Sequence, residues 1–344
     1  MKKIKIAQLA PLWIPVPPRT YGGIELMLSL LTEELVARDY DITLFASGDS
    51  KTSAKLISLT EKAIWLQKDL RSPHAYINIA LEKIYHHRKS FNLFHNHFDF
   101  FMFPLCLSET IPILTTLHRP IDSVAAQAYR AYNKINFCAI SEDQRQSVEE
   151  NGISTIGVVY NGIAPEKYIF KETADDYFIY LGRINKEKGI VDAINVSKEA
   201  GVKLLVAGNI VGGDEWNYFL HEVQPLLNEE NINFIGQLNF NEKVRLLGGA
   251  KALLFPIDRR EPFGLVMIEA MACGTPVIAY RRGSVSEVIK DKKTGFIVNS
   301  KEEMIEAIKK IGVIKRKDCR AHVEQNFTLK QMVDKYEEIY KKLI

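Results

Sequence analysis

The sequence predicts an α/β protein made of two successive domains, each with a parallel sheet and crossover helices. The first observation is the length, since 344 residues exceed the ~100–200 residues that are usual for one domain. The second is an alternation of short apolar runs, rich in β-branched residues, with longer amphipathic stretches. The third is a polar segment at residues 164–175 that interrupts this alternation. We therefore expect two Rossmann-like domains that meet near residue 165.

The N-terminal domain is expected to span residues 1–165. Its first long helix should run from Ile24 to about Arg38, because Leu28, Leu31 and Leu35 recur at helical spacing. Short apolar runs predict the strands of its sheet, at residues 5–10, 42–46, 93–96, 113–116, 136–139 and 157–159.

The C-terminal domain is expected to span residues 166–327, and it repeats the alternation more regularly. Residues 328–344 then form one further helix, because Met332, Tyr336 and Ile339 lie along one stripe. Apolar runs predict the strands of the second sheet, at residues 177–181, 203–207, 233–235, 252–256, 276–279 and 296–298.

The composition excludes several classes of protein. The 45 basic and 42 acidic residues leave a net charge of +3, which is too small to indicate nucleic-acid binding. The four cysteines form no CxxC pair and lie mostly in apolar segments, which suits reduced thiols better than disulfides. No window of ~18 uninterrupted apolar residues is present, so we expect no membrane span. The apolar stretch at the N-terminus is too short for a signal peptide.

Ligands bind beyond the carboxyl ends of the strands in open parallel sheets, so the loops after the strands are the first candidates for a site. The loop after the first expected strand is proline-rich and ends in Gly22-Gly23 at the start of a helix. Adjacent glycines there let backbone amides approach a phosphate closely. A flexible loop before a helix is the alternative. The loop lacks a GxGxxG fingerprint, which counts against a nicotinamide enzyme.

Two cations mark the loop after the first strand of the C-terminal domain. Arg183 and Lys188 flank a turn that follows this strand and opens a helix. Cations beside the free amides at the positive end of a helix form a site for a diphosphate. A solvated, charged turn is the alternative, and the residues alone leave both interpretations open.

The segment EPFGLVMIEAMACGTPVIA, which begins at Glu261, combines two carboxylates with the start of a helix. Glu269 falls beside the apolar stripe of that helix, next to Leu265 and Ile268. A buried carboxylate without a partner would cost roughly several kcal/mol. The vicinal hydroxyls of a ribose would satisfy it, because a carboxylate accepts from both. The alternative is an internal ion pair.

Histidines gather near two expected strand ends. His95 and His97 share one face of a strand, and His118 follows a neighbouring strand. A zinc site needs three or four ligands, and no nearby cysteine or acidic residue completes such a set. The preferred interpretation of His95 and His97 is therefore acceptor binding or strand-end packing, and no metal site is expected.

The spacing Glu261-x7-Glu269 closely resembles that of the family 4 retaining glycosyltransferases, which have the GT-B fold. The resemblance implies two Rossmann-like domains that face each other across a cleft, with a C-terminal helix that crosses back to the N-terminal domain. Further segments resemble the family in the expected order and extend the match over nearly the whole chain, at residues 21–25 (YGGIE), 115–118 (TTLH), 139–142 (AISE), 160–163 (YNGI), 182–189 and 283–295.

The resemblance implies a role for each matched residue of the C-terminal domain. Arg183 and Lys188 would hold the diphosphate of a sugar-nucleotide donor, and Glu269 would hold its ribose. The residues that would lie against the transferred sugar and the phosphates are Glu261, Phe263, Gly264 and Leu265.

The same resemblance implies a smaller set of residues in the N-terminal domain. Gly22 and Gly23 would lend backbone amides, and His118 would lie near the anomeric centre. The chain is short for the family, which leaves the acceptor side of the site unspecified.

The residues and the resemblance together predict a retaining glycosyltransferase. It would move a hexose from a UDP- or GDP-linked donor to a hydroxyl of a glycan, a glycolipid or a small molecule. No carboxylate nucleophile is evident, so we expect front-face transfer in which the leaving phosphate helps to deprotonate the acceptor. No cofactor is expected besides the donor itself. The alternatives are a GT-B sugar-nucleotide epimerase and a protein that binds nucleotide sugars without transferring the sugar.

The sequence favours a cytoplasmic location, and contact with the inner face of the membrane stays open for a lipid-linked acceptor. Two basic clusters are relevant, at residues 86–89 and at Lys309-Lys310 with Lys315-Arg316-Lys317. Such clusters are more often solvated helix faces than lipid-binding surfaces.

Overall fold

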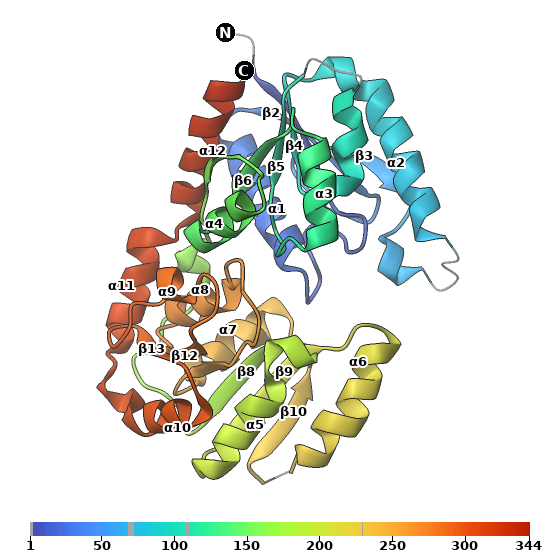
Figure 1. The fold of residues 1–344 in the computed structure, drawn as a ribbon. Helices are drawn as coiled ribbons and strands as arrows, with labels where there is room; N and C mark the ends of the chain where they lie inside the picture. The colour runs from blue at the N-terminus through green and yellow to red at the C-terminus, as the bar shows by residue number, and fades with distance from the viewer. Residues whose placement is uncertain (1–2, 68–71, 108–110, 229) are drawn as a thin grey trace. The chain divides into compact units, whose positions relative to one another are not determined.

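The computed structural model describes residues 3–67, 72–107, 111–228 and 230–344, which form two compact units (Figure 1). Unit 1 comprises Met1–Gly162 and Leu329–Ile344, and unit 2 comprises Ile163–Thr328. The chain therefore leaves unit 1 once and returns to it once. The outgoing and returning segments are held together at the border of unit 2, where the Ile163 amide donates to the Phe327 carbonyl at 3.0 Å.

Unit 1 is built on a parallel sheet with the strand order β3-β2-β1-β4-β5-β6-β7. The order reverses between β1 and β4, and ligands of such sheets bind beyond the strand ends at that point. The edge strand β3 was not predicted, because it is buried only at its end and has no continuous apolar run. The strands are β1 (Lys5–Leu9), β2 (Asp41–Ser47), β3 (Lys55–Thr60), β4 (Leu93–Asn96), β5 (Ile113–Thr116), β6 (Asn136–Ala139) and β7 (Thr155–Val158).

Helices cover both faces of this sheet and bury a core on each. Successive strand residues point to opposite faces, so Ile6 packs with α1 and α12 while Ala7 packs in the core that contains α2 and α3. The helices of unit 1 are α1 (Gly23–Ala37), α2 (Pro73–His87), α3 (Ser123–Ala131), α4 (Glu142–Glu150) and α12 (Leu329–Leu343).

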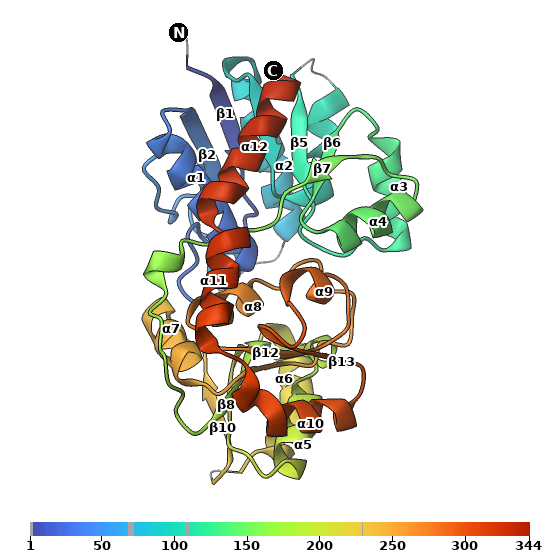
Figure 2. The ribbon, with the colours of Figure 1, turned by 90° about the vertical axis from the view of Figure 1, so that its left-hand side faces the viewer.

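The C-terminal helix α12 belongs to unit 1, as the resemblance implies (Figure 2). Its buried stripe, which includes Met332, Tyr336 and Tyr340, packs in one core with the buried side chains of α1. Arg38, at the end of α1, also forms an ion pair with Asp334 of α12 at 2.6 Å. An amphipathic helix of this kind is held by its packed apolar face.

Unit 2 is built on a second parallel sheet, with the strand order β10-β9-β8-β11-β12-β13. Its order reverses between β8 and β11, so the loops after these two strands are the expected ligand loops. The strands lie within two residues of the predicted ends. They are β8 (Phe178–Arg183), β9 (Leu204–Asn209), β10 (Ile232–Gly236), β11 (Leu253–Phe255), β12 (Val277–Tyr280) and β13 (Gly295–Val298).

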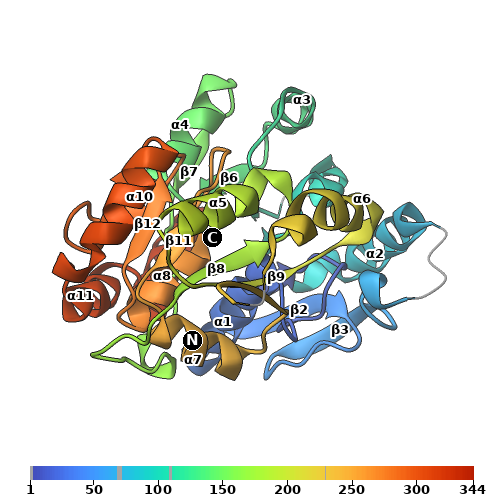
Figure 3. The same cartoon turned by 90° about the horizontal axis from the view of Figure 1, so that it is seen from below.

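Helices also cover both faces of the second sheet. Figure 3 shows α5, α6 and α10 on one face and α7 and α8 on the other. The helices of unit 2 are α5 (Ile190–Glu199), α6 (Gly212–Tyr218), α7 (Phe240–Gly249), α8 (Leu265–Ala272), α9 (Val285–Val288), α10 (Lys301–Lys310) and α11 (Arg316–Asn326).

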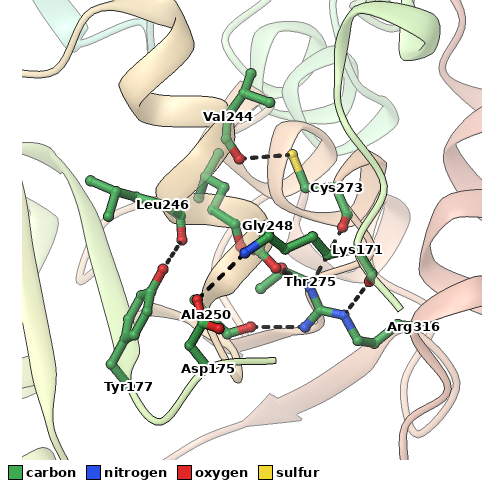
Figure 4. Close-up of polar contacts among 11 residues, drawn as sticks. Lys171, Asp175, Tyr177, Val244, Leu246, Gly248, Ala250, Cys273, Thr275 and Arg316 are labelled. Atoms are coloured by element: carbon green, nitrogen blue, oxygen red, sulfur yellow. Dashed lines mark hydrogen bonds and ion pairs between the residues drawn. The ribbon is translucent and has the colours of Figure 1, made fainter. Parts of the chain in front are cut away.

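Arg316, at the start of α11, binds the protein interior rather than a lipid surface (Figure 4). Its guanidinium donates to the backbone carbonyls of Lys171 at 2.7 Å and Ala250 at 2.8 Å, and to the Thr275 hydroxyl at 2.9 Å. Burial lowers the pKa of this guanidinium. Of the basic cluster Lys315-Arg316-Lys317, the central residue therefore has its guanidinium bound within the protein. Within the described ranges, none of the helices has the length and apolarity that crossing a membrane requires.

Candidate functional site

The loop after β8 has a fixed backbone. A short 3-10 helix, Lys186–Lys188, leads from β8 into α5. The Asn185 side chain accepts a hydrogen bond from the Lys188 amide at 3.1 Å. Gly189 has a φ of 72°, and a Cβ there would lie 1.8 Å from a carbonyl oxygen of the segment after β11. Only glycine fits this turn, which sets the direction in which Lys188 projects.

Lys188 and Glu261 meet at the carboxyl edge of the second sheet. The Lys188 Nζ lies 2.7 Å from the Glu261 Oε2, and both side chains are largely buried. The backbone of Glu261 packs closely against Gly283, where a Cβ would lie 2.3 Å from the Glu261 carbonyl oxygen. The structure therefore brings one predicted cation and one predicted carboxylate together beside the point where the strand order reverses.

Arg183, the last residue of β8, has a carboxylate partner that sequence reasoning missed. Its Nε forms an ion pair with Glu215 of α6. The Glu215 carboxylate also accepts hydrogen bonds from the Val211 amide at 2.6 Å and from the Asn185 Nδ2 at 3.3 Å. Glu215 follows β9 closely, and its place after a neighbouring strand end was the one signal available in the sequence. Both predicted cations are thus charge-balanced before any ligand arrives.

Glu269 is buried, but its carboxylate has partners. Its Oε1 accepts a hydrogen bond from the Tyr168 hydroxyl at 3.0 Å and forms an ion pair with Lys243 of α7. Burial, and then the neighbouring Glu269 charge, raise the pKa of Tyr168. The structure therefore shows the internal ion pair that the sequence left as an alternative. Glu269 therefore needs no ligand to satisfy its carboxylate, and ribose binding by Glu269 stays a prediction.

Of the residues between Glu261 and Glu269, Phe263 lies in the core of unit 2, whereas Gly264 and Leu265 are partly exposed. The Phe263 side chain is 1% exposed and packs edge-on against Phe327, at 5.9 Å between ring centroids. Its ring therefore belongs to the core, which corrects the expectation that it lies against a sugar. Gly264 has a φ of 78° and caps α8, whose first residue, Leu265, is half-buried. Only the backbone at this helix start is placed to meet a phosphate.

In unit 1, the glycine pair begins α1 as predicted. Gly22 has a φ of 146°, and a Cβ there would lie 2.8 Å from the Glu25 carboxylate, so the chain packs tightly at this point. Gly23 is the first residue of the helix. Glu25 is almost fully buried, and this burial raises its pKa to about 7. The sequence analysis assigned no role to this carboxyl group.

The three histidines form a cluster in unit 1, in which His95 and His97 are buried and have no free ring nitrogen, whereas His118 is partly buried. His95 bonds the Tyr340 hydroxyl at 2.7 Å and the Thr116 hydroxyl at 2.8 Å. His97 bonds His118 and Gln8, each at 3.0 Å. These contacts fit the strand-end packing that was one of the two interpretations of His95 and His97, and acceptor binding by them stays a prediction. No group of three metal-ligating side chains is found in the described part of the chain.

Two family models match the chain and together cover residues 21–328. Glycosyltransferase Family 4 matches residues 21–167, and Glycosyl transferases group 1 matches residues 166–328. The N-acetyl-alpha-D-glucosaminyl L-malate synthase of Bacillus anthracis is 27% identical over 68% of this chain and 68% of its own length. Matches with curated relatives span about half to two thirds of the relatives' own lengths.

Solved structures share the fold over nearly the whole chain. A sucrose-phosphate synthase from Thermosynechococcus elongatus superposes with a TM-score of 0.85 at 19% identity, covering 99% of both chains. HepE from Anabaena, solved with UDP-glucose, superposes with a TM-score of 0.79 at 17% identity, covering 98% of this chain and 100% of its own. At these identities the likeness establishes the GT-B fold alone.

Proposed function

Because the chain belongs to the group 1, family 4 glycosyltransferases, we propose that it transfers a hexose from a nucleoside-diphosphate sugar. The donor would be UDP- or GDP-linked, and the acceptor would be a hydroxyl of a glycan, a glycolipid or a small molecule. The anomeric configuration would be retained. Besides the donor and the acceptor, no cofactor or metal takes part.

One observation carries this proposal, namely the pairing of Lys188 with Glu261 at the carboxyl edge of the second sheet, in the loop that follows Arg183. Negative charge grows on the leaving diphosphate as the glycosidic bond breaks. Two cations held by a fixed loop are preorganised to stabilise that charge, and such electrostatic stabilisation is usually the largest catalytic contribution. Both cations already have carboxylate partners, so the diphosphate would compete with Glu215 and Glu261 for the two cations.

The donor class has independent support from a neighbour of the same fold. HepE was solved with UDP-glucose. In the present chain, the ribose would reach Glu269 only by sharing it with Tyr168 and Lys243. A carboxylate accepts several hydrogen bonds at once, so this sharing needs no rupture of the ion pair.

Thermal unfolding in the presence of nucleotide sugars tests the donor. A ligand that binds only the folded state raises its stability by about 2.7 kcal/mol at a hundredfold excess over Kd. We expect one UDP- or GDP-sugar to raise the Tm, and the free nucleoside to raise it less. A panel without any shift would contradict the proposal.

The product decides among transferase, epimerase and binding protein. A transferase releases nucleotide only when an acceptor is added, whereas an epimerase changes the donor sugar without one. NMR of the product then reports the anomeric configuration. An inverted product would contradict retention, and a bound but unconsumed donor would favour the binding protein.

A further inference from the structure

A chain of hydrogen-bonded polar side chains runs through unit 1 from Gln8 to His118. His118 Nε2 lies 3.0 Å from His97 Nδ1, and His97 Nε2 lies 3.0 Å from the Gln8 Oε1. Gln8 and His97 are 0% and 2% exposed, whereas His118 is only partly buried. His118 is thus the end of the chain that solvent or a ligand can reach.

The chain lies where the strand order of the first sheet reverses. Gln8 is on β1, and His97 directly follows β4, where its amide donates to the Leu9 carbonyl at 3.0 Å. β1 and β4 are the two neighbours at that reversal. Ligands of open parallel sheets bind beyond this point, so the chain sits directly beneath the expected binding edge of unit 1.

Hydrogen-bonding chemistry assigns the protons along the chain in sequence. An amide oxygen only accepts, so His97 must carry its proton on Nε2. A neutral imidazole has one N–H, so His97 Nδ1 is bare and accepts from His118. His118 therefore carries its proton on Nε2, and its Nδ1 keeps a lone pair. Within the described part of the chain, no hydrogen bond reaches that Nδ1.

Burial keeps these rings neutral. It lowers the pKa of His97 well below its ordinary value, and the neighbouring histidines lower it further. Burial and the nearby Arg119 charge lower the pKa of His118 to about 3. At neutral pH the free nitrogen of His118 is therefore a hydrogen-bond acceptor, and it is too weak a base to take a proton from an alcohol.

The orientation of the Gln8 amide rests on its oxygen, which lies 3.0 Å from His97 Nε2. The Gln8 Nε2 is buried and makes no hydrogen bond to any described residue. His95 belongs to a separate pair, since its Nδ1 lies 2.7 Å from the Tyr340 hydroxyl of α12. The assignment of protons from Gln8 to His118 therefore depends on the two contacts of His97 alone.

We propose that Gln8 and His97 are positioning residues that hold His118 as its Nε2–H tautomer, which keeps its Nδ1 as a hydrogen-bond acceptor for the sugar that the resemblance implies near His118. The sugar ligand in this statement rests on the function proposed above, whereas the tautomer does not. A donor sugar that presents a hydroxyl to the His118 Nδ1 would gain a hydrogen bond. A donor sugar that presents a group that can only accept hydrogen bonds would not.

Ring-nitrogen NMR of the protein labelled with 15N-histidine tests the tautomer without any substrate. We expect His97 and His118 to be neutral Nε2–H tautomers at pH 7, with His118 assigned through a His118→Gln variant. An Nδ1–H tautomer at His118 would mean that donation runs the other way and would overturn the proposal. Addition of a donor that raises the Tm should shift the His118 Nδ1 resonance, as acceptance of a hydrogen bond requires.

Two substitutions of Gln8 separate positioning from packing. Gln8→Leu removes the acceptor, so His97 and His118 should become mixtures of tautomers, and kcat/KM for transfer should fall about 10-fold, the scale of one hydrogen bond. Gln8→Glu keeps an acceptor and should retain the tautomer and most of the activity. The exposed Gln146→Leu on α4 is the matched control.

The outcomes distinguish this inference from the proposed function. Wild-type tautomers in a folded Gln8→Leu protein, or an unchanged kcat/KM in that variant, would overturn the positioning role. If Gln8→Leu fails to fold, the Gln8→Glu spectrum still decides, because a changed tautomer there contradicts the assignment. If no sugar is transferred at all, the proposed function fails while the tautomer remains measurable.

Discussion

Arg183 and Lys188 each meet a carboxylate from a distant segment of unit 2, and these pairs govern how the two cations respond to a ligand. Glu261 holds Lys188 at 2.7 Å, and Glu215 pairs with Arg183. An ion pair that is largely buried costs much when one member is removed, because the other charge is left uncompensated. Substitution of either member should therefore act on the site as a whole.

Replacement of Lys188 by alanine should lower kcat by about 10², the effect of removing one preorganised group that stabilises the transition state. The exposed Lys186→Ala, two residues earlier in the same turn, is the control and should retain activity. Steady-state kinetics with a saturating acceptor measures both variants. An unchanged kcat for the Lys188 variant would remove this lysine from the mechanism.

Replacement of Glu215 by alanine should raise the KM for the donor about 10-fold, because Arg183 loses the partner that orients it and a hydrogen-bonded carboxylate is lost from the Val211 amide. Asp214→Ala changes the exposed neighbour and should leave the KM unchanged. A lowered KM in the Glu215 variant would show instead that the carboxylate competes with the diphosphate for Arg183.

At the scale of elements, the periodicity of the sequence was enough to place the strands of both sheets except β3. That strand lies at an edge and is half-exposed, so it lacks the continuous apolar run that marked the others. The polar partners were harder to predict. Glu215, Lys243 and Gln8 lie far in sequence from the residues they contact, and nothing in local spacing indicates such pairs. Glu269 shows the consequence, since its partner Lys243 comes from a different helix.

The attachment of α12 to the first sheet should weaken in acid. His95, which bonds Tyr340 of this helix, has its pKa lowered by burial, as does His97. Such groups stabilise the fold fully above the unfolded pKa of about 6.5, and the stability is lost as pH falls below it. Between pH 7.5 and 5.5 each histidine should lower the free energy of unfolding by on the order of 1 kcal/mol, measured by urea unfolding.

Glu25 changes the pH dependence of stability in the direction opposite to the buried histidines, so the measurement needs a control. Burial raises its pKa to about 7, so the folded state gains stability as pH falls through 7 toward 4.5. The comparison is therefore the difference in pH dependence between the wild type and a His95→Gln variant. The exposed His86→Gln should keep the wild-type dependence. Equal slopes in all three proteins would contradict the role of the buried histidine.

Arg316 should be the strongest stabilising cation of unit 2. Its guanidinium links three segments, because it donates hydrogen bonds to the carbonyls of Lys171 and Ala250 and to the Thr275 hydroxyl. Arg316→Ala should lower the free energy of unfolding by about 2–4 kcal/mol, because several buried acceptors lose a charged donor together. The exposed Lys317→Ala should have little effect by the same denaturant titration. Equal stabilities would show that water replaces the guanidinium.

For the whole molecule, the three tryptophans report on the two units separately. Trp13 and Trp65 lie in unit 1, and Trp216 lies on α6 of unit 2. A Trp13→Phe/Trp65→Phe protein follows the unfolding of unit 2, and a Trp216→Phe protein follows unit 1. A nucleotide sugar held by Arg183 and Lys188 should raise the transition seen by Trp216 more than the one seen by Trp13 and Trp65. The reverse order would assign the donor to unit 1.

The path of the chain, out at Ile163 and back after Phe327, has a consequence for synthesis on the ribosome. Unit 2 is one uninterrupted stretch, whereas unit 1 needs α12, which is translated after unit 2. Domains usually fold in the order in which they are synthesised, starting from the N-terminus. In this chain the sheet of unit 1 is made first, but the face that α12 covers stays exposed until α12 has been synthesised. Unit 2 is made later and can nevertheless fold before unit 1 is complete. A stalled chain that ends before Leu329 should therefore resist protease over residues 163–328 and be cleaved within residues 1–162.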